Sequence, residues 1–188
     1  MEDKKSAGIP IVGFLVVERT SSEDGYIAAL MVTDNRGFPL EFKASTPIRP
    51  SLVQKTLYGN QLENYIGVEL CGKTLIQQAA RKTRLILVPE SQLLDISNQV
   101  NINMIAVWHA GESIKVEDES KTASRGTIKP TVSTFKPVVY EGRFIDDANE
   151  KESLEFLHQC AEQFDLVEAF ERIHSALVLL AKEDPRYK

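Results

Sequence analysis

The sequence predicts an α/β (α+β) fold, a mixed sheet of about five strands followed by two helices. Three observations indicate it. Three strand-like segments, separated by turn residues, precede the first helical pattern. Two short apolar runs then alternate with helical segments, as they do in parallel α/β units. The chain has 188 residues, 43% hydrophobic and 26% charged, which is enough for one buried core.

The first three predicted strands form an antiparallel unit. Residues 9–17 are almost continuously apolar, which is typical of a central strand covered on both faces. Residues 26–33 predict a second strand, and the turn sequence 34–37, ending in a glycine, predicts a hairpin. Alternating apolar and polar residues at 40–44 predict a half-buried third strand.

A long helical region follows. Ser51 is the predicted N-cap of its first part, whose apolar residues are Leu52, Val53 and Leu57. The helical spacing continues over 62–70, Gly72 breaks it, and it resumes over 75–82. We therefore expect a kinked helix pair with its bend at Gly72.

The second half of the sheet is predicted from shorter signals. We expect strands at 84–88, 104–109 and 137–140, with a short helix or turn at 91–100. The polar segment 111–136 predicts mostly loop, with one short strand around 114–116.

Two C-terminal helices are predicted at 150–163 and 166–182, each after a sequence that resembles a capping box, beginning at Asn149 and at Asp165. The second helix carries an apolar stripe that we expect to pack mainly on the sheet: Leu166, Phe170, Ile173, Leu177 and Leu180.

We divide the chain into an α/β domain, residues 1–145, and a helical pair packed on it, residues 146–188. The order β-β-β-α-β-α-β followed by helices matches the topology of ribonuclease H-like domains. Other small α/β sandwiches tolerate the same order, and a fold does not by itself define a function.

The charge of the chain is unevenly distributed. Its formal net charge is −5; residues 146–188 contribute −6 and residues 1–145 contribute +1. Two cysteines, no long apolar run and no apolar leader predict a soluble, cytoplasmic protein without membrane contact. A local basic segment could make a weak contact with nucleic acid, although solvated loops are commoner: Lys121, Arg125, Lys129 and Lys136.

One motif suggests nucleotide chemistry. Gly67, Gly72, Lys73 and Thr74 match the P-loop pattern G-x-x-x-x-G-K-[ST]. A working P-loop needs a strand-to-helix turn, whereas the residues before Gly67 have a helical pattern. Glu69 would also place a carboxylate against the phosphates. We therefore favour helix packing as the origin of this motif.

Candidate catalytic residues lie at predicted strand ends and turns: Glu18, Glu41, Glu90, His109 and Glu112. Hydrolysis of a phosphodiester commonly uses two carboxylate-bound metal ions, and His109 could act as a general base. No acid pair within a strand and no metal-ligand spacing accompanies them. We predict no metal site and no cofactor.

The predicted function is a non-enzymatic interaction or accessory subunit of a cytosolic protein complex, with a protein partner. Two alternatives stay open. One is a metal-dependent nuclease with ribonuclease H-like topology, which would use the strand-end acids. The other is a divergent P-loop nucleotide-binding protein.

If the P-loop pattern reflects helix packing, the native protein has negligible affinity for nucleotides. Lys73→Ala should then leave that affinity unchanged, because the residue contacts no phosphate. Calorimetric titration of both proteins with Mg-ATP and Mg-GTP measures this. Micromolar binding that Lys73→Ala abolishes would show that the pattern is a working P-loop.

Overall fold

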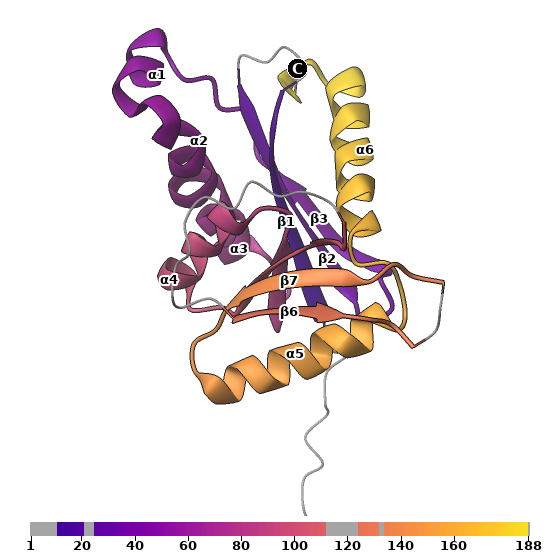
Figure 1. Cartoon of the computed structure of the whole chain (residues 1–188). Coiled ribbons are helices and arrows are strands. Elements are labelled where there is room, and N and C mark those ends of the chain that lie inside the picture. Colours follow the sequence, from indigo (N-terminus) through magenta and orange to yellow (C-terminus); the bar gives the residue numbers. More distant parts are fainter. Residues whose placement is uncertain (1–10, 21–24, 112–123, 132–133, 188) are drawn as a thin grey trace, which may run out of the picture.

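The fold consists of one mixed sheet covered by helices on both faces (Figure 1). A computed structural model describes residues 11–20, 25–111, 124–131 and 134–187. The sheet has seven strands rather than about five, in the order β3-β2-β1-β4-β5-β7-β6. Their bounds are β1 Ile11–Arg19, β2 Tyr26–Asp34, β3 Pro39–Ala44, β4 Leu85–Val88, β5 Met104–His109, β6 Ser124–Ile128 and β7 Val138–Arg143.

The predicted antiparallel unit of three strands is confirmed. β2 pairs antiparallel with both β1 and β3. The chain then returns so that β1, β4 and β5 are parallel neighbours, with their carboxyl ends at one edge of the sheet. The predicted α/β class is confirmed by this arrangement.

The end of the sheet formed by β7 and β6 differs from the prediction. The segment expected to be mostly loop contains β6, which pairs antiparallel with β7, and β7 extends to Arg143. β6 has the sequence SRGTI, and only Ile128 is buried, so its pairing partner rather than its own apolar pattern determines this strand. The strand expected around 114–116 lies outside the described residues.

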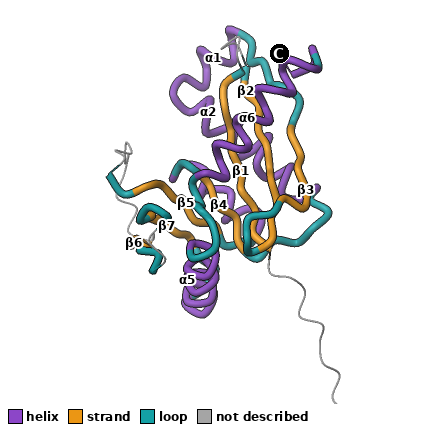
Figure 2. The backbone as a smooth tube through the Cα atoms, turned by 90° about the vertical axis from the view of Figure 1, so that its right-hand side faces the viewer, coloured by secondary structure: helices purple, strands orange, loops and turns teal. Residues whose placement is uncertain are grey.

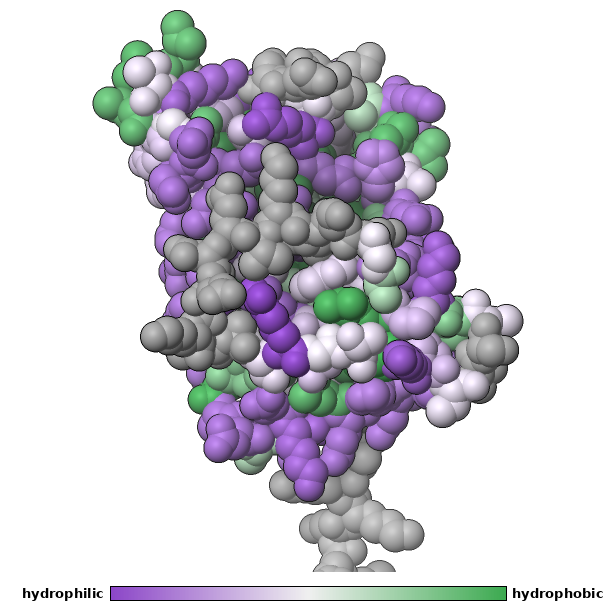
Figure 3. All heavy atoms as spheres, viewed as in Figure 1, coloured by the Kyte–Doolittle hydropathy of each residue, from purple (hydrophilic) through white to green (hydrophobic). Residues whose placement is uncertain are grey.

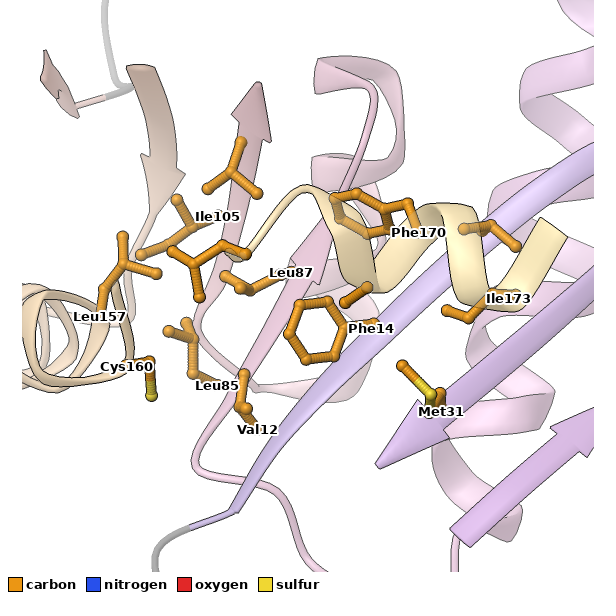
Figure 4. Packing of buried hydrophobic residues seen from close by; sticks show 14 of the residues in the cluster. Val12, Phe14, Met31, Leu85, Leu87, Ile105, Leu157, Cys160, Phe170 and Ile173 are labelled. Atoms are coloured by element: carbon orange, nitrogen blue, oxygen red, sulfur yellow. The ribbon is translucent and has the colours of Figure 1, made fainter. Parts of the chain in front are cut away.

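Helices α5 (Asp147–Ala161) and α6 (Glu168–Glu183) pack on one face of the sheet. Figure 4 shows the Phe14 ring of β1 facing Phe170 of α6, with ring centroids 5.6 Å apart in an edge-to-face arrangement. The stripe predicted to pack on the sheet is confirmed: Leu166, Phe170, Ile173 and Leu177 are buried, and Leu180 is partly buried.

The N-termini of these two helices differ from the prediction. Asp165 accepts hydrogen bonds from the N–H groups of Val167 and Glu168, at 3.0 and 3.4 Å, but α6 begins at Glu168, later than expected, with Val167 as its N-cap, so Asp165 holds the turn before the helix. The predicted cap at Asn149 is wrong. Asp146 caps α5 instead and accepts from the Asn149 N–H at 2.8 Å, because the helix begins three residues earlier than expected.

Helical turns cover the opposite face, where they enclose a second core. They are α2 (Leu62–Asn64), the π-helical η2 (Tyr65–Gly72), α3 (Lys73–Gln78), η3 (Ser91–Ile96) and α4 (Ser97–Val100). Two turns without buried residues, α1 (Leu52–Tyr58) and η1 (Gly59–Gln61), precede them, and a last turn, η4 (Pro185–Tyr187), follows α6. The short helical segment predicted at 91–100 is confirmed. None of the described helices is long and apolar enough to cross a membrane.

The predicted bend at Gly72 is wrong. Gly72 has helical backbone angles, φ −60° and ψ −53°, so the helix from Leu62 to Gln78 continues through it. A Cβ at Gly72 would lie 2.4 Å from Ile96 Cδ1 and 2.7 Å from the Gly67 carbonyl oxygen. Gly72 therefore permits close packing inside a continuous helix.

The first helix, α1, lies apart from the core. Ser51 caps it as predicted, through a reciprocal pair of hydrogen bonds with Gln54. None of its residues is buried, and Figure 3 shows apolar side chains gathered at the upper left, over α1. The exposed apolar residues of this helix are Leu52, Val53 and Leu57, at 80%, 66% and 77%.

The packing of α6 predicts that Phe170→Ala lowers the free energy of unfolding by about 3–5 kcal/mol, because it removes a core ring in contact with Phe14. Urea unfolding followed by circular dichroism measures it. Leu52→Ala, at an exposed apolar position of α1, is the control and should change stability by less than about 0.5 kcal/mol. Equal effects of the two substitutions would contradict this account of the core.

Candidate functional site at the carboxyl edge of the parallel strands

Two of the predicted site residues, Glu18 and His109, lie near the carboxyl ends of β1 and β5 on the face covered by α6, and each has a partner there. Glu18 Oε2 lies 2.8 Å from His174 Nδ1. His109 is 8% exposed, and its Nε2 lies 3.0 and 3.1 Å from the two carboxylate oxygens of Asp165. Each pair connects the end of a strand to α6 or to the turn before it. Both Glu18 and His109 therefore have a structural role that accounts for their positions.

Glu41 lies away from the carboxyl edge. It pairs with Val32, which in turn pairs with Gly13 near the start of β1. Its carboxylate accepts hydrogen bonds from the N–H groups of Ala80 and Arg81, at 2.9 and 3.1 Å. The Ala80 hydrogen bond holds the pKa of the Glu41 carboxyl below its usual range. Glu41 therefore fastens the chain after α3 to β3, and the remaining candidate, Glu112, lies outside the described residues.

Glu90 is the predicted acid whose surroundings disfavour its charged form. It lies two residues after the end of β4 and precedes η3, which covers the face of the sheet opposite α6. Burial raises the pKa of its carboxyl, and the nearby charge of Glu63 raises it further. Glu63 comes from α2 and was missed, because the sequence contains no signal that α2 meets the end of β4. The fold thus places Glu63 where its charge acts on Glu90, although the two residues are separated in sequence.

A third acid, Glu141, belongs to a row of residues that crosses four neighbouring strands. Glu141 of β7 is opposite Ala106 of β5 and Arg125 of β6, and Ala106 is opposite Val88, two residues before Glu90. Glu141 is 4% exposed; its Oε2 accepts from Ser91 Oγ at 2.9 Å and lies 3.0 Å from an Arg125 guanidinium nitrogen. Its charge is therefore already paired.

The structure separates the predicted basic segment. Arg125 is paired with Glu141, whereas Lys129 and Lys136 are exposed beyond the ends of β6 and β7. Lys121 lies outside the described residues. Of the three predicted cations that the structure describes, Arg125 is therefore the one in the polar row beside Glu90.

Another cation, Arg19, was not predicted. It is the last residue of β1, and its side chain is 56% exposed. One of its guanidinium nitrogens lies 3.8 Å from Glu63 Oε2, and the guanidinium lies over the Tyr26 ring, 5.3 Å from the centroid. A guanidinium oriented in this way can still donate hydrogen bonds to a phosphate.

The donors present determine which metal ion could fit. Across residues 11–20, 25–111, 124–131 and 134–187, no group of three or more His, Cys, Asp or Glu side chains could hold a metal ion. A two-metal centre therefore does not fit these residues. A single Mg²⁺ commonly takes one or two protein carboxylates and completes its shell with water and phosphate oxygens, and Glu63 and Glu90 are the carboxylates at this edge that could supply them.

The residues of the P-loop pattern lie in the helix on this same face. Gly67 and Gly72 belong to η2, and Lys73 and Thr74 begin α3. Thr74 Oγ1 donates to the Leu70 carbonyl at 2.9 Å, and a Cβ at Gly67 would lie 3.0 Å from Leu93. The pattern therefore lies within a helix rather than in a strand-to-helix turn, and close packing explains both glycines.

Comparison with known proteins shows what this fold resembles. No family model matches the chain, and no curated protein sequence matches it. Endonuclease V from Bacillus subtilis superposes with a TM-score of 0.60 at 10% identity, over 93% of this chain and 83% of that one. Endonuclease V from Ciona intestinalis, solved with a 23mer DNA containing an inosine followed by a ribo-adenosine, gives 0.50 at 10% identity, over 92% and 88%.

The chain therefore has the ribonuclease H-like fold that its element order matches. The similarity contradicts our prediction of a non-enzymatic interaction or accessory subunit, because the structures that share the fold are nucleases. It fits the predicted alternative, a nuclease of this topology. The predicted protein partner receives no support from it.

The raised pKa of Glu90 gives a test of this environment. Because the folded state holds the proton of Glu90 more tightly than the unfolded state does, this residue lowers stability as pH rises above the usual glutamate pKa of 4.5. Glu90→Gln should therefore be more stable than the native protein at pH 7, with a difference that shrinks as pH falls through 4.5. Urea unfolding at several pH values measures it, with Glu155→Gln, on an exposed turn of α5, as the control. A difference independent of pH would contradict the assignment.

Proposed function

We propose that this protein binds nucleic acid at the carboxyl edge of β1 and β4 and hydrolyses it with the help of one divalent cation held by Glu63 and Glu90. The observation that carries the proposal is the end of β1, where the Arg19 guanidinium lies 3.8 Å from Glu63, whose charge also acts on Glu90, in a fold shared with endonuclease V. In open α/β sheets, the carboxyl ends of parallel strands are where ligands commonly bind.

The side chains at this edge have complementary tasks. Arg19 is exposed and oriented by Tyr26, so it can contact a phosphate of the strand. The pKa of the Glu90 carboxyl is raised by desolvation and by the nearby charge of Glu63, so a divalent cation beside it would stabilise its charged form. A divalent cation held here would stabilise the negative charge that develops on a phosphodiester under attack.

The charge distribution supports the direction of approach. The acidic C-terminal segment, with a net charge of −6 over residues 146–188, forms α5 and α6 on the other face. Arg19 and Arg125 lie at or beside the edge that carries Glu90. A polyanion is therefore repelled less on the side of η2 and η3 than on the side of α6.

The binding part is tested with labelled single-stranded and double-stranded DNA and RNA, with and without inosine, over a range of salt concentrations. We expect Arg19→Ala to weaken binding about equally for all sequences and to reduce the salt slope of log K by about one, as for a lost phosphate contact. Lys151→Ala, at an exposed position of α5, is the control and should leave both quantities unchanged. Failure of the native protein to bind any of these ligands would refute the proposal.

The hydrolytic part is tested on the same substrates with Mg²⁺ or Mn²⁺ and with EDTA. We expect cleavage that needs the cation and that Glu90→Gln reduces by at least about a hundredfold, the scale of a lost group that acts in the transition state. Glu155→Gln should cleave normally. Cation-independent binding without cleavage would remove the hydrolytic part and leave nucleic-acid binding as the function.

A further inference from the structure

We infer that Trp108 stacks on an unpaired base, so that the nucleic acid bound at the carboxyl edge is single-stranded; this inference rests on the proposed function. Trp108 is the last residue but one of β5, the strand next to β4 (Figure 2). Its indole packs on the second core but is only partly buried. An aromatic ring that is fixed by packing and still open to solvent is a suitable stacking platform for a base.

Trp108 lies beside the segment that carries Glu90. Ser91, the next residue, donates to Glu141 of β7 at 2.9 Å, and this hydrogen bond spans β5, which lies between β4 and β7. It does so at the level of Ala106, the residue of β5 opposite Glu141. Trp108 is the next residue of β5 on that face, one pleat nearer the carboxyl edge. The indole therefore borders the segment of Glu90 on the side from which a ligand would approach.

Arg19 and Trp108 lie on the same face of the sheet, near the carboxyl ends of β1 and β5. The Arg19 guanidinium lies over the ring of Tyr26, and Tyr26 and Trp108 both pack on the second core. β4 separates the two strands, so their axes are about 10 Å apart. A nucleotide strand that crosses this edge can place a phosphate on Arg19 and a neighbouring base on Trp108, with Glu90 between them.

A duplex fits this arrangement less well than a single strand. Bases inside a duplex are stacked on each other, so none of them can lie on an indole unless it leaves the stack. Affinity for a duplex also depends on many neutralised phosphates, whereas the chain has a formal net charge of −5. With few cations available, contacts with bases have to supply much of the affinity, and only an unpaired base offers its face.

The first test uses the fluorescence of the native protein, which reports on Trp108 alone because the chain has one tryptophan. The protein is titrated in EDTA, which prevents cleavage, with a single-stranded DNA and with a fully abasic strand of the same length. We expect the base-bearing strand to quench the fluorescence at saturation, and the abasic strand to leave it near its free value. Equal quenching by the two strands would overturn the inference.

The second test measures affinity by the fluorescence anisotropy of labelled strands. Trp108→Leu keeps an apolar side chain on the second core but removes the aromatic face. We expect it to weaken binding of the base-bearing strand by about 5- to 150-fold, the effect of one lost stacked base, and to leave the affinity for the abasic strand unchanged. Its salt slope should equal that of the native protein, because no phosphate contact is lost. Trp108→Phe, which retains an aromatic face, should restore most of the affinity.

Phe38→Leu is the matched control, since Phe38 is another partly exposed aromatic side chain, at 57%. It follows the hairpin at Asp34, which pairs with Ile11 at the start of β1, so it lies at the opposite edge of the sheet. This variant should bind both strands as the native protein does. Circular dichroism shows whether each variant is folded.

The outcomes separate this inference from the proposed function. If Trp108→Leu is folded and binds the base-bearing strand as tightly as the native protein, or loses affinity equally for both strands, the stacking role is refuted. Cation-dependent cleavage by the native protein would leave the proposed function standing in either case. A native protein that binds neither strand, with or without Mg²⁺, would overturn both.

Discussion

The close contact between the helix from Leu62 to Gln78 and the sheet is the constraint on which the rest of the structure depends. At Gly72 any side chain would meet Ile96 and the Gly67 carbonyl, and at Gly67 it would meet Leu93. The two glycines let this helix lie low on β1 and η3, so that both faces of the central strand are buried. The same contact holds the N-terminal end of the helix, with Glu63, at the carboxyl edge of β4.

The candidate site is thus a consequence of packing. The charge of Glu63 acts on Glu90 because the helix that follows Glu63 is packed against the sheet, and the raised pKa of Glu90 is a consequence of that packing. The other acids near strand ends have different neighbours. Glu18 is next to His174, and Glu141 is bonded to Ser91 and next to Arg125, so their charges are satisfied within the fold. An acid whose charged form the fold disfavours is a stronger functional candidate than a paired one.

The two faces of the sheet differ in chemistry. The carboxyl edge combines carboxylates with an exposed guanidinium, which suits a phosphate chain and a cation. Trp108, at the same edge, adds a partly exposed indole, which suits an unpaired base. The acidic helices α5 and α6 cover one face of the sheet, and their charge favours approach of a polyanion from the other face.

The sequence by itself determined the elements whose signals are local. The apolar run of β1, the hairpin before β3, the Ser51 cap and the stripe on α6 depend on neighbours within a few residues, and the structure has all of them. Their order was also enough to indicate a ribonuclease H-like topology.

Only the tertiary structure decided the features that depend on distant partners. The polar segment β6 forms a strand because its backbone pairs with β7. The same pairing places Arg125 next to Glu141. The sequence from Gly67 to Thr74 matches the P-loop pattern, yet close helix packing explains both of its glycines. Glu63 and Glu90 become neighbours through the path of the chain between them. No local pattern contains that path, because burial and charge interactions depend on proximity in space rather than in sequence.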